Sequence, residues 1–539
     1  MNRLAPSAPV RILLLAPDLL GESLALQLTR RQSDWEVSLR PDALNGHPQI
    51  VIWSIDKLPS LSALQREVLL LQERWHPAPL LLLLPRNVEA SRDQLLTLSA
   101  EGLLQNGDCA QLQVAIDTLL QGGRTVRLQT VAPPSEPPSL GLAQSLLLSG
   151  LQQISNDLQV IEALLKPPPH SWLLCLLLEG RCRELRSARA LLLWLWGPLQ
   201  VGLEDAVPLR VPMQPSPPAE ESTAITLRQR NALAVWNSIR ERLDGSVQTG
   251  LSNATGRLLA IEGLHPDRRR ELLLALLQQL DHVLARLRHE DPAPARWSSL
   301  QPELRRQALT AMAGSYVQIP RDGVLQPVAS TLLASADLEG VDDEMPDPAS
   351  MLMPLLADQP VLVNGQLLPA DDPRALLQLE TLVSNWLVRT AELIGAELLE
   401  ACGEWPELRR YLLGDRLLAT RELDRLRNQL NNQLRWSEWI ERPIQLYESN
   451  RTLFQLRAGR IEPLQLTEPR DQELNSLGWW QRQVALLLET RDALAPQLQA
   501  LVRRLGDLAV VLLTQVLGRA IGLVGRGIAQ GMGRSLGRG

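Results

Sequence analysis

The stretch Arg11-Ile-Leu-Leu-Leu-Ala16 decides how the first part of this chain folds. It is a short apolar run that ends at Pro17, and this pattern predicts a strand that is buried on both faces of a sheet. Similar runs follow at residues 50–53 and 80–84, and a shorter one lies at 102–104. Together they predict the parallel strands of one sheet.

Segments with helical spacing separate these runs. Leu20, Leu24 and Leu28 recur every four residues within residues 19–28, a second helical stretch covers about 61–75, and a third covers 110–120. The last one stops at Gly122-Gly123, a typical end for a helix. Strands that alternate with helices at this length predict a doubly wound, parallel α/β sheet.

The order and spacing of these elements resemble those of response-regulator receiver domains, which have a flavodoxin-like α/β fold. The resemblance implies a ligand site at the carboxyl ends of the strands. In that family an acidic pair after the first strand holds Mg²⁺, and an aspartate ending the third strand accepts the phosphoryl group. A serine or threonine ends the fourth strand, and a lysine follows the fifth. Mg²⁺ and a phosphoryl group require such hard oxygen ligands and a compensating cation.

This chain departs from the receiver pattern at all of these positions. The corresponding residues are Ala16 and Pro17, Ser54, Leu84, and Asn106 or Gln105. Asp18 and Asp56 lie close by, and an alignment shift of one or two residues would make them candidates for phosphorylation. The resemblance therefore implies a degenerate receiver that is kept for binding proteins. The alternative is another kind of small α/β domain.

At 539 residues the chain is long enough for about three to four domains. Proline-rich stretches and composition mark the boundaries. We expect a receiver-like α/β domain (1–128), a Pro-rich linker (129–138), a Leu-rich helical connector (139–205), a second Pro-rich linker (206–222), a helical domain (223–505) with an irregular insert at about 315–372, and an amphipathic Gly/Arg-rich tail (506–539). The fold class is thus multidomain, α/β followed by mostly α-helical domains.

The Leu-rich connector contains two strongly apolar runs, at residues 172–178 and 190–196. Each is shorter than the roughly 20 residues that a membrane-spanning helix needs. We therefore expect the buried helices of a small bundle, with a membrane-contacting hairpin as the alternative. In the insert, the acidic stretch 337–347 lacks the spacing of a calcium loop, so we expect a solvated loop. Asn364-Gly365 lies between apolar runs and predicts a short β-hairpin.

A second resemblance covers residues 223–539. The stretches Leu430-Asn-Asn-Gln-Leu-Arg-Trp436 and Pro443-Ile-Gln-Leu-Tyr-Glu-Ser-Asn-Arg451, together with the glycine-rich tail, resemble the hypothetical chloroplast open reading frame fifty-five family of cyanobacteria and algal plastids. The resemblance implies a photosynthetic cell and an accessory role. With a receiver-like domain at the start of the chain, it implies a cyanobacterial member.

The tail has basic and apolar residues on opposite sides of a helical wheel. The candidate contact residues are Arg519, Arg526, Arg534, Leu517, Ile521 and Val524. A basic amphipathic helix without acidic residues favours contact with an anionic membrane surface. A partner protein, packing against the protein's own helices and contact with nucleic acid are the alternatives.

Five aromatic residues in the C-terminal half are possible partner anchors. They are Trp436, Trp439, Tyr447, Trp479 and Trp480. Tryptophan beside arginine is typical of contact surfaces. The alternative is that they belong to the core, because the chain has 14 tryptophans and a single phenylalanine.

Composition restricts the partners and the compartment. The net charge of −6 argues against nucleic-acid binding, because nucleic acid requires clustered positive charge. The four cysteines form no Cys-x-x-Cys pair, and the first ten residues lack the apolar core of a secretory signal. We expect a cytoplasmic protein that contacts the thylakoid membrane peripherally.

The sequence contains no phosphate-binding loop and no His-Glu-x-x-His motif. We expect no enzymatic activity, no metal and no cofactor. The resulting hypothesis is a regulatory or assembly scaffold that binds an unidentified protein through its receiver-like domain. The alternatives are an atypical response regulator that is phosphorylated at Asp18 or Asp56, and an enzyme with an unrecognised site in the helical domain.

Overall fold

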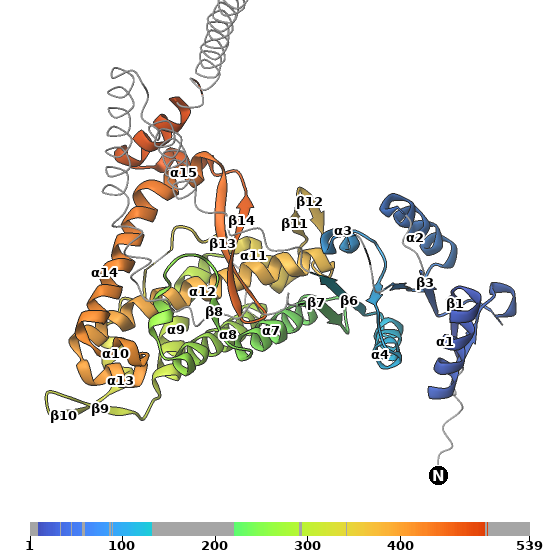
Figure 1. Cartoon of the computed structure of the whole chain (residues 1–539), viewed down its shortest axis with the longest axis horizontal. Helices are drawn as coiled ribbons and strands as arrows, with labels where there is room; N and C mark the ends of the chain where they lie inside the picture. The colour runs from blue at the N-terminus through green and yellow to red at the C-terminus, as the bar shows by residue number, and fades with distance from the viewer. Residues whose placement is uncertain are drawn as a thin grey trace, which may run out of the picture. The chain divides into compact units, whose positions relative to one another are not determined.

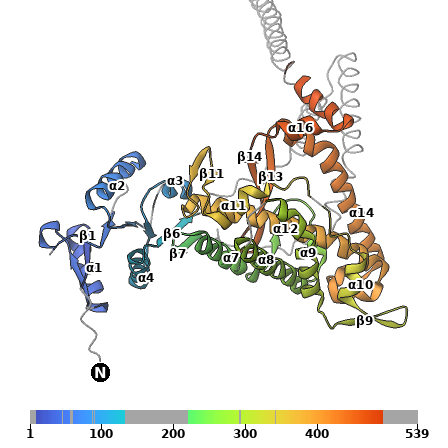
Figure 2. The same cartoon turned by 180° about the vertical axis from the view of Figure 1, so that it is seen from behind.

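The computed structural model describes residues 9–131, 220–289, 294–490 and 493, apart from residues 33, 45, 56–59, 86–87, 89 and 341. It divides into two compact units, of which the first holds residues 1–430 and 453–464 and the second holds residues 431–452 and 465–539. Figures 1 and 2 show the elements from opposite sides. The predicted connector and tail lie outside the described residues.

Seven strands of the first unit form one sheet in the order β2-β1-β3-β4-β5-β6-β7. They are β1 (Val10–Leu15), β2 (Trp35–Ser38), β3 (Ile50–Ser54), β4 (Leu80–Leu84), β5 (Gly102–Gln105), β6 (Arg124–Val131) and β7 (Glu220–Leu227). The first six are parallel, whereas β7 is antiparallel to β6. The four apolar runs are confirmed as β1, β3, β4 and β5, and the α/β class of this domain is confirmed with them.

Helices cover both faces of this sheet. They are α1 (Asp18–Arg31), α2 (Leu61–Trp75), α3 (Arg92–Leu96) and α4 (Cys109–Leu120). In both views α1 and α4 lie on one side, and α2 and α3 lie on the other. The helical predictions at 19–28, 61–75 and 110–120 are confirmed.

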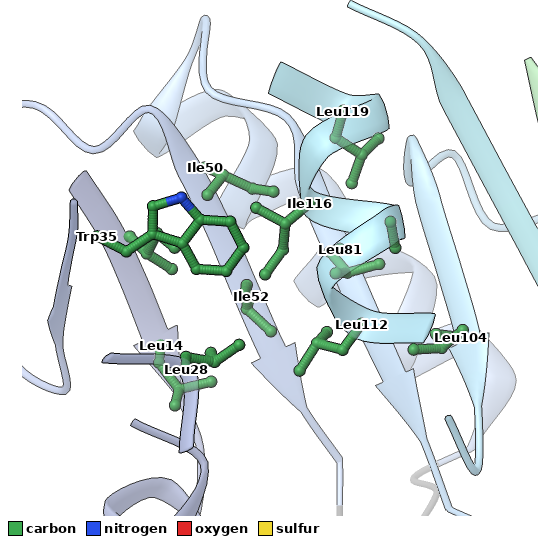
Figure 3. Close-up of a cluster of buried hydrophobic side chains, with 12 residues drawn as sticks. Leu14, Leu28, Trp35, Ile50, Ile52, Leu81, Leu104, Leu112, Ile116 and Leu119 are labelled. Carbon is green, nitrogen blue, oxygen red and sulfur yellow. The ribbon is translucent and has the colours of Figure 1, made fainter. Parts of the chain in front are cut away.

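The sheet is buried on both faces. Figure 3 shows the side where α1 and α4 pack on alternate strand residues. The buried cluster consists of Ile12, Leu14, Leu28, Trp35, Ile50, Ile52, Leu81, Leu104, Leu112, Ala115, Ile116 and Leu119. Because side chains alternate along a strand, Leu13, Val51 and Leu82 point to the opposite face, and they are buried as well. Burial on both faces explains why these strands are continuous apolar runs.

Strand β7 joins the sheet from a distant part of the sequence. It spans the end of the predicted Pro-rich linker (206–222) and the start of the predicted helical domain (223–505). It pairs with β6 along its whole length, from Arg124 opposite Leu227 to Val131 opposite Glu220. The chain therefore leaves the sheet after residue 131 and returns beside the same point at residue 220. The intervening segment, 132–219, is inserted where a β-hairpin would have its turn.

The rest of the first unit is mainly helical, as predicted. Its helices are α7 (Ala232–Gln248), α8 (Pro266–His289), α9 (Pro294–Ala313), α10 (Val328–Ser335), α11 (Pro348–Ala357), α12 (Pro373–Glu404) and α13 (Arg409–Leu412). The long helix α12 is central, because it packs against α7, α8, α9 and α11. Most of its side chains between Ala375 and Cys402 are buried.

The insert at 315–372 is more regular than we predicted. Besides α10 and α11 it contains two antiparallel hairpins, β9 (Gln318–Arg321) with β10 (Val324–Pro327) and β11 (Val361–Val363) with β12 (Gln366–Leu368). The Asn364-Gly365 hairpin is confirmed, because both residues have positive φ, at 49° and 79°. Positive φ at both turn positions matches the twist of the two strands, which favours Asn-Gly.

Further described elements cover residues 420–476, and residues 479–490 are helical as well. They are α14 (Thr420–Trp436), the π-helical turn Ser437–Glu441, α15 (Arg442–Tyr447), β13 (Asn450–Arg457), β14 (Arg460–Thr467) and α16 (Asp471–Ser476). Within the first unit, Arg460 and Ile461 of β14 pair with the short strand β8 (Ser252–Asn253).

Candidate functional site

The receiver-like positions meet at the carboxyl edge of the sheet. Ala16 follows β1, Ser54 ends β3, Leu84 ends β4 and Asn106 follows β5. The register makes them neighbours: Leu15 lies opposite Trp53, Ser54 opposite Leu83, and Leu84 opposite Gln105. The sequence thus placed these positions at one edge, and the structure brings them together there.

The side chains at this edge serve the fold. Leu84 is 4% exposed and packs in the core. Asn106 has a φ of 49°, a conformation that asparagine tolerates better than most residues, and its N–H donates to the carbonyl of Leu84 at 3.3 Å. The side chain of Gln105 is buried, and its Oε1 accepts the N–H of Gln129 in β6 at 2.9 Å. Both candidates for the lysine position therefore have structural roles.

The two nearby aspartates are not part of this geometry. Asp56 lies outside the described residues, and of Asp18 only the backbone, at the start of α1, is described. In the described part of the chain, no group of three or more His, Cys, Asp and Glu side chains is placed to hold a metal ion. Among the described residues, this edge offers the hydroxyl of Ser54, the exposed amide of Asn106 and apolar groups.

Three of the five predicted aromatic anchors gather in the second unit. Trp439, Trp479 and Trp480 line a groove of about 420 Å³, and their side chains are 53%, 73% and 58% exposed. The rings of Trp479 and Trp480 are 6.0 Å apart. Gln481 stabilises the groove, since its Nε2 donates to the carbonyl of Glu438 at 3.0 Å. Exposed tryptophans in a groove are typical of contact surfaces.

The other two aromatic anchors are outside this groove. Trp436 ends α14 and Tyr447 ends α15, and both are half-buried. The residues of the tail that we expected to contact a membrane or a partner lie outside the described residues. In the part of the chain that the structure describes, no helix has both the length and the apolar character to span a bilayer.

A charge cluster of the second unit escaped the sequence analysis. Arg451 donates to Glu468 and to Glu473, the latter at 2.6 Å, and Arg470 donates to Glu473 at 2.5 Å. Burial works to raise the pKa of Glu473, but the hydrogen bonds and charges of Arg470 and Arg451 outweigh it and hold that pKa below its ordinary value. Arg451, the last residue of the stretch Pro443–Arg451, is therefore a buried cation with a structural role.

A half-buried carboxylate on α12 also escaped prediction. The Oε2 and Oε1 atoms of Glu392 accept the N–H groups of Ala260 and Ile261, at 2.6 and 3.0 Å. Burial raises the pKa of Glu392 to about 7. The sequence offers no signal for this, because a single glutamate in an amphipathic helix is normally exposed.

Comparison with known proteins confirms both resemblances. A family described as "Cyanobacterial response regulator, helical hairpin domain" matches residues 141–196, and a "Protein of unknown function (DUF3685)" family matches residues 342–533. A Ycf55-like protein of Synechocystis sp. (strain ATCC 27184 / PCC 6803 / Kazusa) is 28% identical over 537 residues, which cover 96% of this chain and 92% of that protein. No solved structure matches. None of these descriptions names a catalytic activity.

Proposed function

We propose that this protein is a regulatory or assembly scaffold of cyanobacteria, in which a phosphorylation-dead receiver-like domain binds a partner protein. One observation carries the proposal: Ala16, Ser54, Leu84 and Asn106 occupy the strand ends where receivers hold Mg²⁺, phosphate and lysine. The strand order β2-β1-β3-β4-β5 is that of flavodoxin-like sheets, which supports the receiver interpretation.

The inserted segment supports a regulatory role. The family match at 141–196 lies within the segment that leaves and re-enters the sheet between the paired residues Val131 and Glu220. Movement of this segment would act directly on β6 and β7. A partner that binds the segment is therefore mechanically connected to the receiver-like sheet.

A phosphorylation assay tests the first part of the proposal. The purified full chain is incubated with acetyl phosphate and Mg²⁺, and its intact mass is measured. We expect no added phosphoryl group in the wild type, and no difference in the variants Asp18→Ala and Asp56→Ala. Phosphorylation that is lost in either variant would contradict the proposal.

The binding role is tested by a substitution at the strand ends. Ser54→Arg places a long cation at the carboxyl edge, where we expect it to reduce co-purification of the partner from native cells. Thr29→Arg is the matched control, because Thr29 is exposed near the carboxyl end of α1 and thus towards the opposite edge of the sheet. Equal loss in both variants, or no loss in Ser54→Arg, would argue against this face.

An atypical response regulator is the second candidate. The match to a response-regulator helical hairpin favours it. The same assay separates the two candidates, because phosphorylation that depends on Asp18 or Asp56 supports signalling.

The tail gives the proposed scaffold a second contact. Its basic and apolar sides suit an anionic thylakoid surface. Flotation of the full chain with anionic vesicles tests this contact, with neutral vesicles and a variant that ends at Leu505 as controls. Binding that survives the truncation would assign the contact to another surface.

A further inference from the structure

The helix at residues 479–490 of the second unit is apolar on two opposite sides. At about 100° per residue, Val484 and Leu488 lie on one side, where they are half-buried. The other side holds positions 479, 480, 483, 486, 487 and 490, none of which carries a charged residue. Its large apolar side chains are exposed in the described part of the chain: Trp479 by 73%, Trp480 by 58%, Leu486 by 50% and Leu487 by 69%. A surface helix normally has a single apolar side, which packs on the core, so the second one indicates a further contact.

Trp439 extends this exposed side. It is 53% exposed and lines the groove of about 420 Å³ together with Trp479 and Trp480. We call these three tryptophans, Leu486 and Leu487 the tryptophan face. Five large side chains that are each at least half exposed leave on the order of 500 Å² of apolar surface in water. The largest apolar patch of a typical monomer is about 300–600 Å², and such patches often have a function.

The polar groups around the tryptophan face serve the fold. Gln481 donates to the carbonyl of Glu438 at 3.0 Å, and its Oε1 accepts the N–H of Gly478 at 3.1 Å. The hydroxyl of Thr490 donates to the carbonyl of Leu486 at 2.7 Å. The exposed carboxylate of Glu438 borders the groove and repels anions. The face therefore suits a contact that depends on the burial of apolar surface and not on attraction between opposite charges.

The chain continues from this helix into the basic tail at 506–539. The tail has no acidic residue after Asp507. Residues 491–505 separate the tail from the helix, and a segment of that length spans at most about 50 Å even when fully extended. A tail that is bound to a membrane therefore keeps the tryptophan face within that distance of the same membrane.

We propose that the tryptophan face inserts into the interfacial layer of a lipid bilayer. The rings of Trp479 and Trp480 are 6.0 Å apart and inclined by 44°. A fluid interface accepts two such projecting rings without a complementary pocket, and it is the region where tryptophan is enriched in membrane proteins. An apolar helix face in this layer is buried to a depth of about 5–10 Å. The inference rests on the proposed membrane contact of the tail, because the tail is what brings the face to the bilayer.

Vesicle binding of the purified full chain tests the proposal at two salt concentrations. At 1 M NaCl the Debye length is about 3 Å, which screens the attraction between the tail and anionic lipid. We expect binding to persist at 1 M NaCl and to include neutral phosphatidylcholine vesicles. Leu486→Gln combined with Leu487→Gln should weaken this binding by about 10-fold, since partial burial of two leucines is worth at least that much.

Two leucines of the first unit provide the matched control. Leu69 and Leu70 are also adjacent on a helix, α2, and each is 58% exposed. Leu69→Gln combined with Leu70→Gln should leave vesicle binding unchanged. Unchanged binding of the Leu486/Leu487 variant, or an equal loss in both variants, would refute the proposal and leave a protein partner as the occupant of the face.

Tail variants separate this inference from the proposed contact of the tail. Arg519→Gln, Arg526→Gln and Arg534→Gln together should weaken binding to anionic phosphatidylglycerol vesicles at low salt and have no effect at 1 M NaCl. If these substitutions have no effect at low salt, the proposed tail contact fails. The Leu486/Leu487 result at 1 M NaCl still decides whether the face binds lipid.

Fluorescence quenching detects the insertion directly and does not depend on a polar substitution. Lipids that are brominated on their acyl chains quench tryptophans that enter the bilayer. Trp479→Phe combined with Trp480→Phe keeps the face apolar, so this variant should bind vesicles as the wild type does. We expect it to lose most of the quenching that the bound wild type shows. Equal quenching of the variant and the wild type would contradict insertion of this face.

Discussion

Replacing Glu392 with glutamine should reduce the pH dependence of stability in the helical part of this protein. Glu392 on α12 accepts the N–H groups of Ala260 and Ile261. From the other side, Arg269 on α8 donates to the carbonyls of Ile261 and Glu262, at 3.0 and 2.9 Å. The backbone of the turn Ala260–Gly263 is therefore hydrogen-bonded to two helices, α8 and α12. The charge of Glu392 affects the hydrogen bonds on both sides of the turn.

The magnitude follows from the pKa. Burial raises the pKa of Glu392 from 4.5 to about 7, although the two backbone hydrogen bonds act in the opposite direction. Between these values the folded state binds more protons than the unfolded state, so stability falls as the pH rises through this window. A difference of 7 − 4.5 pKa units corresponds to about 3 kcal/mol of stability, present below pH 4.5 and lost above pH 7. This is an upper value, because the side chain is only half-buried.

Glutamine resembles the protonated carboxyl group at all pH values. We expect Glu392→Gln to be within about 1 kcal/mol of the wild type near pH 5, the cost of one imperfect hydrogen bond. Near pH 8 we expect the variant to be more stable than the wild type by up to about 3 kcal/mol.

Hydrogen exchange of peptides that cover residues 256–270 gives the local free energy of opening at each pH. Glu397→Gln is the matched control, because Glu397 lies on the same helix and accepts one backbone N–H, that of Asp337 at 2.9 Å. This control should keep the pH dependence of the wild type. If the difference between Glu392→Gln and the wild type is the same at both pH values, the reasoning is refuted.

Three further predictions concern the fold. Replacing residues 132–219 with an Asn-Gly turn should leave the first sheet folded, because β6 and β7 are already paired as a hairpin. Circular dichroism and hydrogen exchange measure this, and loss of the strand signal or of the amide protection of β6 would contradict it. Gly365→Val should destabilise the β11–β12 hairpin by about 1–2 kcal/mol, since the φ of 79° is unfavourable for a β-branched residue; thermal unfolding should show it, and Gly340→Val, at a glycine without positive φ, should have a smaller effect. Glu473→Gln should cost about 3 kcal/mol, because it leaves Arg451 and Arg470 buried with fewer partners. As the pKa of Glu473 is lowered in the fold, the wild type should lose this stability as the pH falls through that pKa; an unchanged urea midpoint at neutral pH would disprove it.

Much of the first sheet follows from local patterns. The runs that became β1, β3, β4 and β5 are apolar because both faces of each strand are covered, and this signal needs no knowledge of the partner strand. Asn364-Gly365 likewise specifies its own hairpin, because the positive φ values are a local property of these two residues. For the same reason the positions Ala16, Ser54, Leu84 and Asn106 could be assigned to strand ends before their neighbours were known.

The edges of the sheet were not predictable in this way. β2 has only four residues and β6 alternates polar and apolar side chains, as in Arg124-Thr-Val-Arg-Leu-Gln. β7 is recognisable only through its pairing with β6, and 88 residues separate the two strands. Whether such a strand forms depends on closing a long loop between it and its hydrogen-bond partner. Loop closure produces no periodic pattern of residues in the sequence.

The sequence by itself determined which segments are strands or helices with buried faces, and it placed Ala16, Ser54, Leu84 and Asn106 at the ends of strands. Only the tertiary structure decided which of the five aromatic anchors share a groove, and that Glu392 accepts two backbone N–H groups of the turn Ala260–Gly263. The physical reason is that periodicity reports the burial of a helix face or strand face. The partner of a single polar side chain depends on segments that only folding brings together.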